Sequence, residues 1–325
     1  MSDPAGYDPP WWYRGAHLQT VWGPLLRRFR PQPYRRERVA TPDGDFVDLD
    51  WLDAGRGAGD APLVLVLHGL EGSSRSHYVL GLVREAVAAN LSAAVLNFRS
   101  CSGEPNRAPR LYHSGETSDL DWVVGRILDR APRRRIGLVG VSLGGNVALK
   151  WLGERGAGAP VEAAVAISTP FDLAACAGVL DRGVRRALYT SGFLRTMRAK
   201  VRAKRPSLDG RIDWAGALRA RTFAEYDRAV TAPLHGFADE HDYWARSSSA
   251  RYLADIRRPC LLVNAVNDPF IPPAALPRAV VAASPWLEAL FVDEGGHAGF
   301  LEAPLGRRSW AERRALAFLA ARLLG

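Results

Sequence analysis

The 325-residue chain is poor in the residues and patterns that build disulfide frameworks, metal centres and membrane spans. Its three cysteines, Cys101, Cys176 and Cys260, lie far apart and form no C-x-x-C pair, which argues against disulfides and a zinc site and favours a reducing compartment. No apolar run approaches the roughly 18 residues that a membrane-spanning helix needs. Residues 1–6 contain neither the charged nor the apolar segment of a secretory signal. We therefore expect a cytoplasmic protein.

The charge balance is basic, but its pattern is not that of a nucleic-acid-binding protein. Lys and Arg number 43 against 34 Asp and Glu, a formal net charge of +9. A basic surface suits anionic membranes or acidic substrates. No Lys/Arg tract is interleaved with aromatic residues at a spacing that would stack bases, so we expect no nucleic-acid partner.

Short apolar runs alternate with helical patterns through the first half of the chain. Residues 63–67 form a continuous run of Leu and Val, which is typical of a strand covered on both faces. Further buried strands are expected at 93–97, 135–139, 163–168, 260–264 and 287–292, with helices near 76–90, 117–130, 146–152 and 309–324. This alternation predicts a doubly wound, mostly parallel sheet. Residues 36–52 predict a hairpin with one buried face.

The alternation stops between residues 171 and 250, where the sequence contains only helical stretches and loops. A long excursion between two buried strands is typical of a cap inserted over the carboxyl-terminal edge of a sheet. We therefore assign residues 1–170 and 251–325 to an α/β core and 171–250 to a helical cap. Residues 1–38, with their aromatic and Arg side chains, are expected to form an arm packed on the core; the alternative is an interfacial membrane anchor.

The expected cap contains a basic amphipathic stretch. Residues 182–205 carry nine Lys or Arg and no acidic residue. Apolar side chains recur there every three to four residues, at Val184, Leu188, Phe193, Leu194, Met197 and Val201. This predicts a helix, broken near Gly192, whose apolar stripe packs on the core while its basic face is solvated. The alternative is a lid whose basic face contacts a lipid surface or an anionic substrate.

The stretch from Gly140 to Gly145, Gly-Val-Ser-Leu-Gly-Gly, is the strongest chemical motif in the chain. It lies between an apolar β-branched run and a helical pattern, the context that makes G-x-S-x-G a nucleophile elbow. A serine held in such a turn needs glycines beside it because neighbouring chains approach closely. The sequence therefore predicts Ser142 as a nucleophile, with the backbone N–H of Leu143 aimed at a developing oxyanion.

A second oxyanion donor is expected in the loop from His68 to Ser74, directly after the strand at 63–67. Such a loop supplies the other backbone N–H in an elbow-bearing sheet, and we assign this donor to Leu70. The ring of His68 itself is expected to be structural and to bond its own loop.

A serine nucleophile needs a histidine base and a carboxylate that orients it. Asp268 and His297 each follow an apolar run and lie among turn-forming residues, and they complete the chain order Ser, acid, His. Asp172 is the second choice for the acid, whereas Asp293 lies at the end of its own strand. The other histidines, His17, His77, His113, His235 and His241, have no strand-end context and no metal-ligand spacing, so we expect neither a metal nor another cofactor.

Together these stretches resemble the YheT-like group of α/β-hydrolases, which includes bacterial and eukaryotic esterases and lipases. The matching stretches are 17–22 (HLQTVW), 68–72 (HGLEG), 97–103 (NFRSCSG), 140–146 (GVSLGGN), 231–237 (TAPLHGF), 267–272 (NDPFIP) and 295–297 (GGH). The resemblance implies the triad already argued, with the oxyanion hole at Leu70 and Leu143, and hydrolysis of carboxylic esters of acyl chains or lipids. Ser100 departs from the group, which has glycine there, and this puts the local turn in question.

The sequence therefore predicts a cofactor-free serine esterase that acts through an acyl-enzyme on a small-molecule ester or lipid. Acyl transfer or thioester hydrolysis would use the same residues, and a catalytically silent binding protein on the same fold is a further alternative. Aromatic residues of the cap suggest an apolar acyl pocket or a small core of the cap itself. Neither the substrate nor the oligomeric state follows from the sequence.

Overall fold

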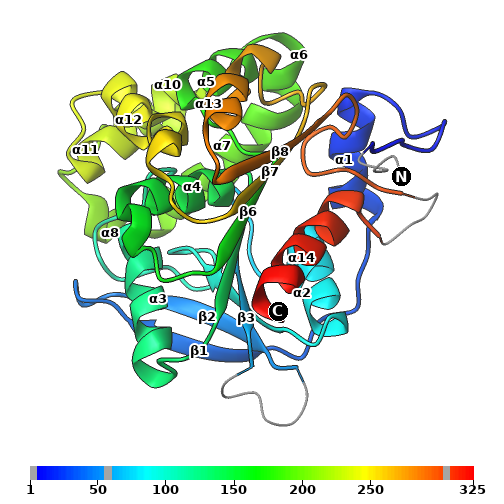
Figure 1. Cartoon of the computed structure of the whole chain (residues 1–325). Helices are drawn as coiled ribbons and strands as arrows, with labels where there is room; N and C mark the ends of the chain where they lie inside the picture. The colour runs from blue at the N-terminus through cyan, green and yellow to red at the C-terminus, as the bar shows by residue number, and fades with distance from the viewer. Residues whose placement is uncertain (1–5, 55–60, 303–307) are drawn as a thin grey trace.

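A mixed sheet with helices on both faces forms the body of the molecule (Figure 1). The structure is a computed structural model that describes residues 6–54, 61–302 and 308–325, and within them the sheet has eight strands in the order β1-β2-β4-β3-β5-β6-β7-β8. The strands are β1 (Arg35–Ala40), β2 (Phe46–Leu52), β3 (Leu63–Leu67), β4 (Ser92–Asn97), β5 (Ile136–Val141), β6 (Ala163–Ile167), β7 (Cys260–Ala265) and β8 (Leu287–Val292). Neighbours from β4 to β8 are parallel, which confirms the predicted mostly parallel sheet.

Alternate residues of the central strands face two separate apolar cores. Along β3, Leu63, Leu65 and Leu67 belong to one core and Val64 and Val66 to the other, as the two-residue period of a strand requires. Helices α2 (His77–Ala88) and α14 (Trp310–Leu323) cover one face, and α3 (Ser118–Arg130) and α4 (Leu143–Arg155) cover the other (Figure 1). A sheet covered on both faces brings the carboxyl ends of its parallel strands to one edge, where loops can form a site.

The hairpin of β1 and β2 differs from its prediction. Both antiparallel strands are present, but β2 is buried on both faces rather than one. The reason is that its charged positions are ion-paired. Asp48 and Asp50 are each about 1% exposed and accept hydrogen bonds from Arg38 (2.9 Å) and Arg36 (2.7 Å) of β1. The alternating acidic residues of β2 therefore form a ladder of buried ion pairs with β1, and that face of the strand is not exposed to solvent.

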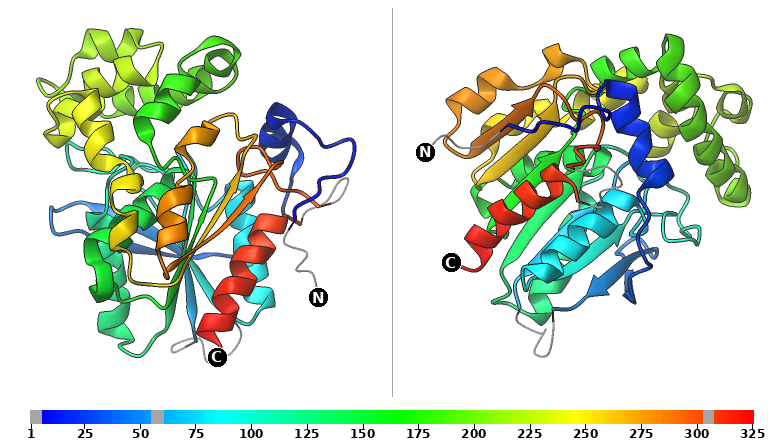
Figure 2. Two further views of the ribbon diagram at one scale, coloured as in Figure 1. Left: turned by 45° about the horizontal axis from the view of Figure 1, so that its top comes forward. Right: turned by 90° about the vertical axis from the view of Figure 1, so that its right-hand side faces the viewer.

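Between β6 and β7 the chain forms helices and turns that gather at one end of the sheet (Figure 2). The helices are α5 (Leu173–Leu180), α6 (Gly183–Arg185), α7 (Ser191–Ala203), α8 (Arg205–Leu208), α9 (Trp214–Arg219), α10 (Phe223–Tyr226), α11 (Ala232–His235) and α12 (Glu240–Ser247). Widened π-helical turns lie at Arg186–Thr190 and Asp227–Thr231. The segment ends in 3-10 turns at Ser249–Arg251 and Leu253–Asp255. Outside it are α13 (Arg278–Ala283) and the 3-10 turns at Gly156–Gly158 and Pro273–Ala275.

The basic stretch is helical as expected, but it is not broken at Gly192. Helix α7 runs through this glycine, and the irregularity is instead the π-helical turn before it. One glycine costs a helix only about 1 kcal/mol, which the burial of Leu194 (1% exposed) and Val201 (0%) offsets. Val184 and Leu188, by contrast, are exposed. The predicted apolar stripe thus packs on the protein only along α7.

The N-terminal arm contains a helix that the sequence did not predict, α1 (Ala16–Leu26), with Pro24 inside its last turn. Before it, Tyr13 is fully buried while Trp11 is exposed. Residues 1–5, on which the expectation of no secretory signal partly rests, lie outside the described residues. The arm closes against the loops that follow β7 and β8.

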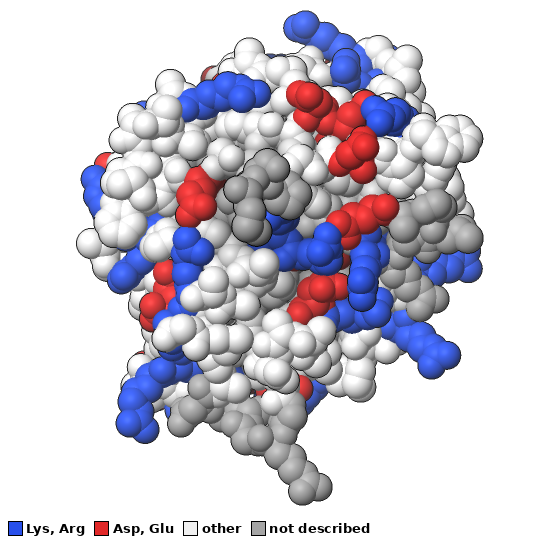
Figure 3. Space-filling view, turned by 45° about the vertical axis from the view of Figure 1, so that its right-hand side comes forward, with Lys and Arg blue, Asp and Glu red and all other residues white. Residues whose placement is uncertain are grey.

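The net positive charge does not produce a uniformly basic surface. On the face that carries α1, α2 and α14, basic and acidic side chains lie beside one another (Figure 3). Exposed pairs such as Arg14 with Asp8 (2.9 Å) and Arg313 with Glu302 account for part of this mixture. All three cysteines are free thiols, and no described helix is both long and apolar enough to cross a bilayer.

Candidate active site

Ser142 lies in a sharp turn between β5 and α4 and adopts φ 55° and ψ −122°. This left-handed backbone is strained for a residue with a side chain. The turn depends on the flanking glycines: a Cβ on Gly144 would overlap the carbonyl oxygens of Leu67 and His68, and one on Gly140 would overlap the carbonyl of Gly144. The predicted elbow is therefore the turn that the chain adopts.

The side chains of Ser142, Asp268 and His297 meet although they come from three separate loops. The Nε2 atom of His297 lies 2.9 Å from the Oγ of Ser142, and its Nδ1 lies 2.8 Å from the Oδ2 of Asp268. These loops follow β5, β7 and β8 at the same edge of the sheet. The imidazole thus bridges a hydroxyl and a carboxylate, the arrangement in which a serine can lose its proton to histidine.

Asp268 is enclosed in protein. Burial raises the pKa of its carboxyl, and this rise is opposed by His297 and by the hydrogen bond from the backbone N–H of Phe270 (2.8 Å). The ring of Phe270 also stacks on the imidazole of His297, with centroids 4.0 Å apart. The imidazole is therefore held both at its edge and on its face.

The two other acids considered from the sequence do not contact His297. Asp172 caps α5, where its side chain accepts a hydrogen bond from the N–H of Ala175 (3.0 Å). Asp293 is the first residue after β8, and its backbone carbonyl accepts a hydrogen bond from the N–H of Asn267 (3.2 Å). His68 bonds its own loop through the carbonyl of Gly69 (2.8 Å), as expected for a structural ring.

Leu70 and Leu143, whose backbone N–H groups are the predicted oxyanion donors, belong to the lining of the cavity that contains Ser142. Leu143 is the first residue of α4, and Leu70 follows β3; both line one cavity with Ser142 and His297. A Cβ on Gly69 would lie 3.1 Å from the Cβ of Ser142, so this loop passes close to the serine. No hydrogen bond among the described residues occupies either N–H.

The loop of Leu70 is fixed by groups that the sequence did not predict. Glu71 adopts φ 57°, its N–H donates to the hydroxyl of Tyr112 (2.7 Å), and that hydroxyl donates back to Oε1 of Glu71 (2.7 Å). The same carboxylate accepts from Nζ of Lys200 on α7 (2.7 Å). Burial works against the charge of Lys200, but Cys101 and Glu71 raise its pKa. Only the fold brings these distant residues together, so no local signal could have found them.

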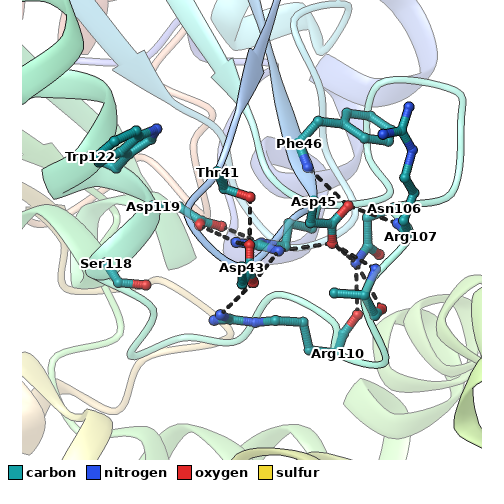
Figure 4. Close-up of polar contacts among 12 residues, drawn as sticks. Thr41, Asp43, Asp45, Phe46, Asn106, Arg107, Arg110, Ser118, Asp119 and Trp122 are labelled. Carbon is teal, nitrogen blue, oxygen red and sulfur yellow. Dashed lines mark hydrogen bonds and ion pairs between the residues drawn. The ribbon is translucent and has the colours of Figure 1, made fainter.

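A second polar network supports the loop that leads to Tyr112 (Figure 4). Arg99 is 2% exposed and pairs with Asp119 (2.6 Å) and Asp45 (2.8 Å). Beside it, Ser100 adopts φ 62°, the conformation that favours glycine, and its hydroxyl donates to Asn106 (2.6 Å). The turn in question at Ser100 is therefore formed, and a side-chain hydrogen bond supports it.

Above Ser142 and His297 is a largely apolar cavity with a volume of about 1050 Å³, its open mouth included. Loops of the sheet and helices between β6 and β7 line it together. Its apolar lining includes Leu70, Leu111, Leu143, Pro170, Leu173, Ala177, Leu180, Phe193, Met197, Phe223, Val230, Leu234 and Phe270. The Ser142 hydroxyl thus opens into space that an apolar chain can fill.

Comparison with known proteins identifies the family of the chain. The profile of a family described as alpha/beta hydrolase fold matches residues 62–304. The chain belongs to the α/β hydrolase family. "Putative esterase YheT" of Escherichia coli (strain K12) is 37% identical over 318 residues, 97% of this chain and 93% of that protein. "Phospholipase ABHD3" of Mus musculus is 30% identical over 91% of this chain and 73% of its own length. The YheT-like resemblance is thereby confirmed.

A solved structure, that of the Pyrococcus furiosus esterase Pf2001, shares the fold with a TM-score of 0.58 and 17% sequence identity. The match covers 97% of this chain and 100% of that chain. At 17% sequence identity, this comparison shows a similar fold and nothing further.

The cavity of this α/β hydrolase also contains polar groups to which the sequence assigned no catalytic role. His113 and His235 line it with their rings 4.4 Å apart. Burial raises the pKa of Asp227 to about 7, against hydrogen bonds from Thr231 (2.6 Å) and Trp244 (2.9 Å). Among the described residues, no group of three or more His, Cys, Asp or Glu side chains could hold a metal ion.

Proposed function

We propose that this α/β hydrolase cleaves carboxylic esters through an acyl-enzyme formed on Ser142. The observation that carries the proposal is the pair of contacts made by His297, 2.9 Å to the Ser142 hydroxyl and 2.8 Å to the Asp268 carboxylate. The names of the relatives, esterase and phospholipase, support the same reaction class.

In the first half of the reaction, Ser142 Oγ attacks the ester carbonyl carbon while Nε2 of His297 takes its proton. The carbonyl oxygen becomes an oxyanion, which the N–H groups of Leu70 and Leu143 stabilise. Asp268 holds the proton on Nδ1 and compensates the imidazolium charge. When the tetrahedral intermediate collapses, His297 returns the proton to the departing alkoxide, and the acyl group stays on Ser142.

In the second half, His297 takes a proton from water, whose oxygen attacks the acyl carbonyl. The same two N–H groups stabilise the second oxyanion, and its collapse releases the carboxylic acid as Ser142 regains its proton from His297. Every proton is moved by one imidazole, so no cofactor takes part in this scheme.

The cavity supports a substrate with an apolar acyl group. We propose residues 171–250 as a cap that closes over the site, because α5, α7 and α10 supply Leu173, Phe193 and Phe223 to its lining. A small-molecule ester or a lipid fits this lining. Contact with an anionic lipid surface would involve Val184 and Leu188, which are 64% and 52% exposed beside Arg185 and Arg186.

The test is hydrolysis of p-nitrophenyl esters, from acetyl to palmitoyl, by the wild type, Ser142→Ala and the control Ser191→Ala. Ser191 is an exposed serine whose hydroxyl bonds the carbonyl of Arg186. We expect turnover and fluorophosphonate labelling by the wild type and the control, and neither by Ser142→Ala. A wild type that hydrolyses no ester and takes no label would refute the proposal. Faster release of p-nitrophenol with added alcohol, with a new ester as product, would indicate acyl transfer on the same serine.

A further inference from the structure

Helix α1 contacts both loops that carry the acid and the base, although it contributes no group to the reaction itself. We propose that Gln19 and Thr20 of α1 are positioning residues, which hold the Asp268 and His297 loops in the register that proton transfer requires. This inference rests on the proposed function, because it assigns a role in the same reaction.

Thr20 fixes the main chain of His297. Its Oγ1 accepts a hydrogen bond from the His297 N–H (2.9 Å) and donates its own proton to the carbonyl of Ala16 (2.7 Å). On the next residue, the N–H of Ala298 donates to Oγ of Ser168, directly after β6 (2.9 Å). The backbone that carries the imidazole is therefore tied to α1 on one side and to the sheet on the other.

Gln19 connects the two loops to each other. It is fully buried, and its Oε1 accepts from the N–H of Gly295 (2.9 Å) and from Nδ2 of Asn267 (3.0 Å). Its Nε2 donates to the carbonyl of Tyr13 (2.9 Å). Asn267, the neighbour of Asp268, in turn accepts from the N–H of Gly296 (2.9 Å). One buried amide thus joins the residue before the acid to the loop of the base.

The backbone of the His297 loop lies directly against α1. Gly296 has φ 57°, and a Cβ there would lie 2.8 Å from the Cβ of Gln19 and 2.9 Å from the carbonyl oxygen of Ala16. Only glycine permits this approach. The loop therefore cannot shift toward the helix, and the hydrogen bonds of Gln19 and Thr20 oppose a shift away from it.

The register matters because the 2.8 Å contact between His297 and Asp268 joins loops from different strands. A displacement of about 1 Å in a catalytic geometry can lower a rate roughly a hundredfold. The residues of α1 act on this geometry without touching the reacting atoms, so their loss should lower kcat more than it raises KM.

The experiment uses the full chain with Thr20→Val, Thr20→Ser and the control Thr196→Val. Valine has nearly the shape of threonine but leaves the His297 N–H without an acceptor, whereas serine restores the hydroxyl. Thr196 is a matched control because its hydroxyl also donates to a preceding helix carbonyl, that of Phe193 (2.8 Å), and contacts neither loop. We expect Thr20→Val to lower kcat by about tenfold or more with KM within about twofold, and Thr20→Ser and Thr196→Val to behave as the wild type.

Two further measurements separate positioning from general loss of structure. Fluorophosphonate labelling of Ser142 should slow in Thr20→Val as kcat does. The label reacts with a serine that the His297 imidazole has activated, and a displaced imidazole activates it less. The downfield proton resonance of the His297 Nδ1–H should broaden or shift in Thr20→Val and in Gln19→Met, at a temperature where circular dichroism shows both to be folded.

The inference is overturned if folded Thr20→Val matches the wild type in kcat, labelling rate and imidazole resonance. It is also overturned if Thr20→Ser is as impaired as Thr20→Val, since the hydroxyl would then not be the cause. Failure of the proposed function looks different: the wild type itself would neither hydrolyse esters nor take the label.

Discussion

Replacing Tyr112 by Phe should impair the proposed oxyanion hole, while its aromatic ring stays in the lining of the cavity. The change removes one hydroxyl, which accepts from the N–H of Glu71 and donates to its carboxylate, both at 2.7 Å. The aromatic ring should stay in place because it stacks on Phe98 with centroids 5.5 Å apart. The backbone of Glu71, with φ 57°, would then lose its anchor beside Leu70.

The size of the effect follows from the two lost hydrogen bonds. A neutral hydrogen bond contributes about 1 kcal/mol and one to a charged group about 1.5–3 kcal/mol, so roughly 2.5–4 kcal/mol favours the present loop conformation. Loss of an oxyanion donor costs about a hundred- to a thousandfold in kcat. Because Leu70 keeps its N–H and Lys200 still holds Glu71, we expect a partial effect, a fall in kcat of about ten- to a hundredfold.

The assay is steady-state hydrolysis of the best p-nitrophenyl ester by Tyr112→Phe and by the control Tyr252→Phe, with thermal unfolding of each. Tyr252 loses the same atom, and its exposed hydroxyl donates to a backbone carbonyl, that of Arg246 (3.0 Å), away from the loop of Leu70. A Tyr112→Phe enzyme whose kcat stays within twofold of the wild type would refute the reasoning. So would equal losses in both variants.

Three further predictions concern the acid, a buried titrating group and a buried ion pair. Asp268→Asn should lower kcat by about 10⁴-fold with little change in KM, because the amide favours the wrong imidazole tautomer; the same ester assay measures it, and a loss below tenfold would point to another acid. Burial raises the pKa of Asp227 from 3.8 to about 7, so this group stabilises the fold below pH 4 and that contribution is lost as the pH rises through 7. Asp227→Asn should therefore raise the melting temperature at pH 8 and raise it much less at pH 4.5, as calorimetry at both values would show; an equal shift at both would contradict the assignment. Arg27→Met should destabilise the protein by about 3–5 kcal/mol, since it leaves the Glu312 carboxylate buried without its Arg27 partner; denaturant unfolding gives the value, and a loss under 1 kcal/mol would contradict it.

The candidate site was predictable where local sequence controls local geometry. The Gly140–Gly145 stretch predicts a tight turn because its glycines allow backbone segments to approach too closely for a Cβ atom. The structure shows this close approach at Gly140 and Gly144. Asp268 and His297 were predictable from a topological rule: parallel strands bring their carboxyl ends to one edge, so loops after β5, β7 and β8 must meet.

The errors share one physical cause, which is that partners distant in sequence decide the environment of a residue. The alternating Asp48 and Asp50 predicted a solvent face, but Arg36 and Arg38 pair with them in the interior. Gly192 predicted a helix break, but the packing of α7 on the protein outweighs one glycine. Helix and strand propensities describe an isolated segment. Burial against the rest of the protein changes which conformation is the more stable one.

By itself the sequence determined the fold class, the parallel sheet, the nucleophile turn and the order of the three candidate residues, because hydrophobic period and glycine sterics act over a few residues. Only the tertiary structure decided what supports them: Gln19 and Thr20 against the His297 loop, and Tyr112 and Lys200 against Glu71. These contacts join segments separated by 41 to 277 residues. A hydrogen bond leaves no periodic signal in the chain, so its partners become known only when folding has brought them within 3 Å of each other.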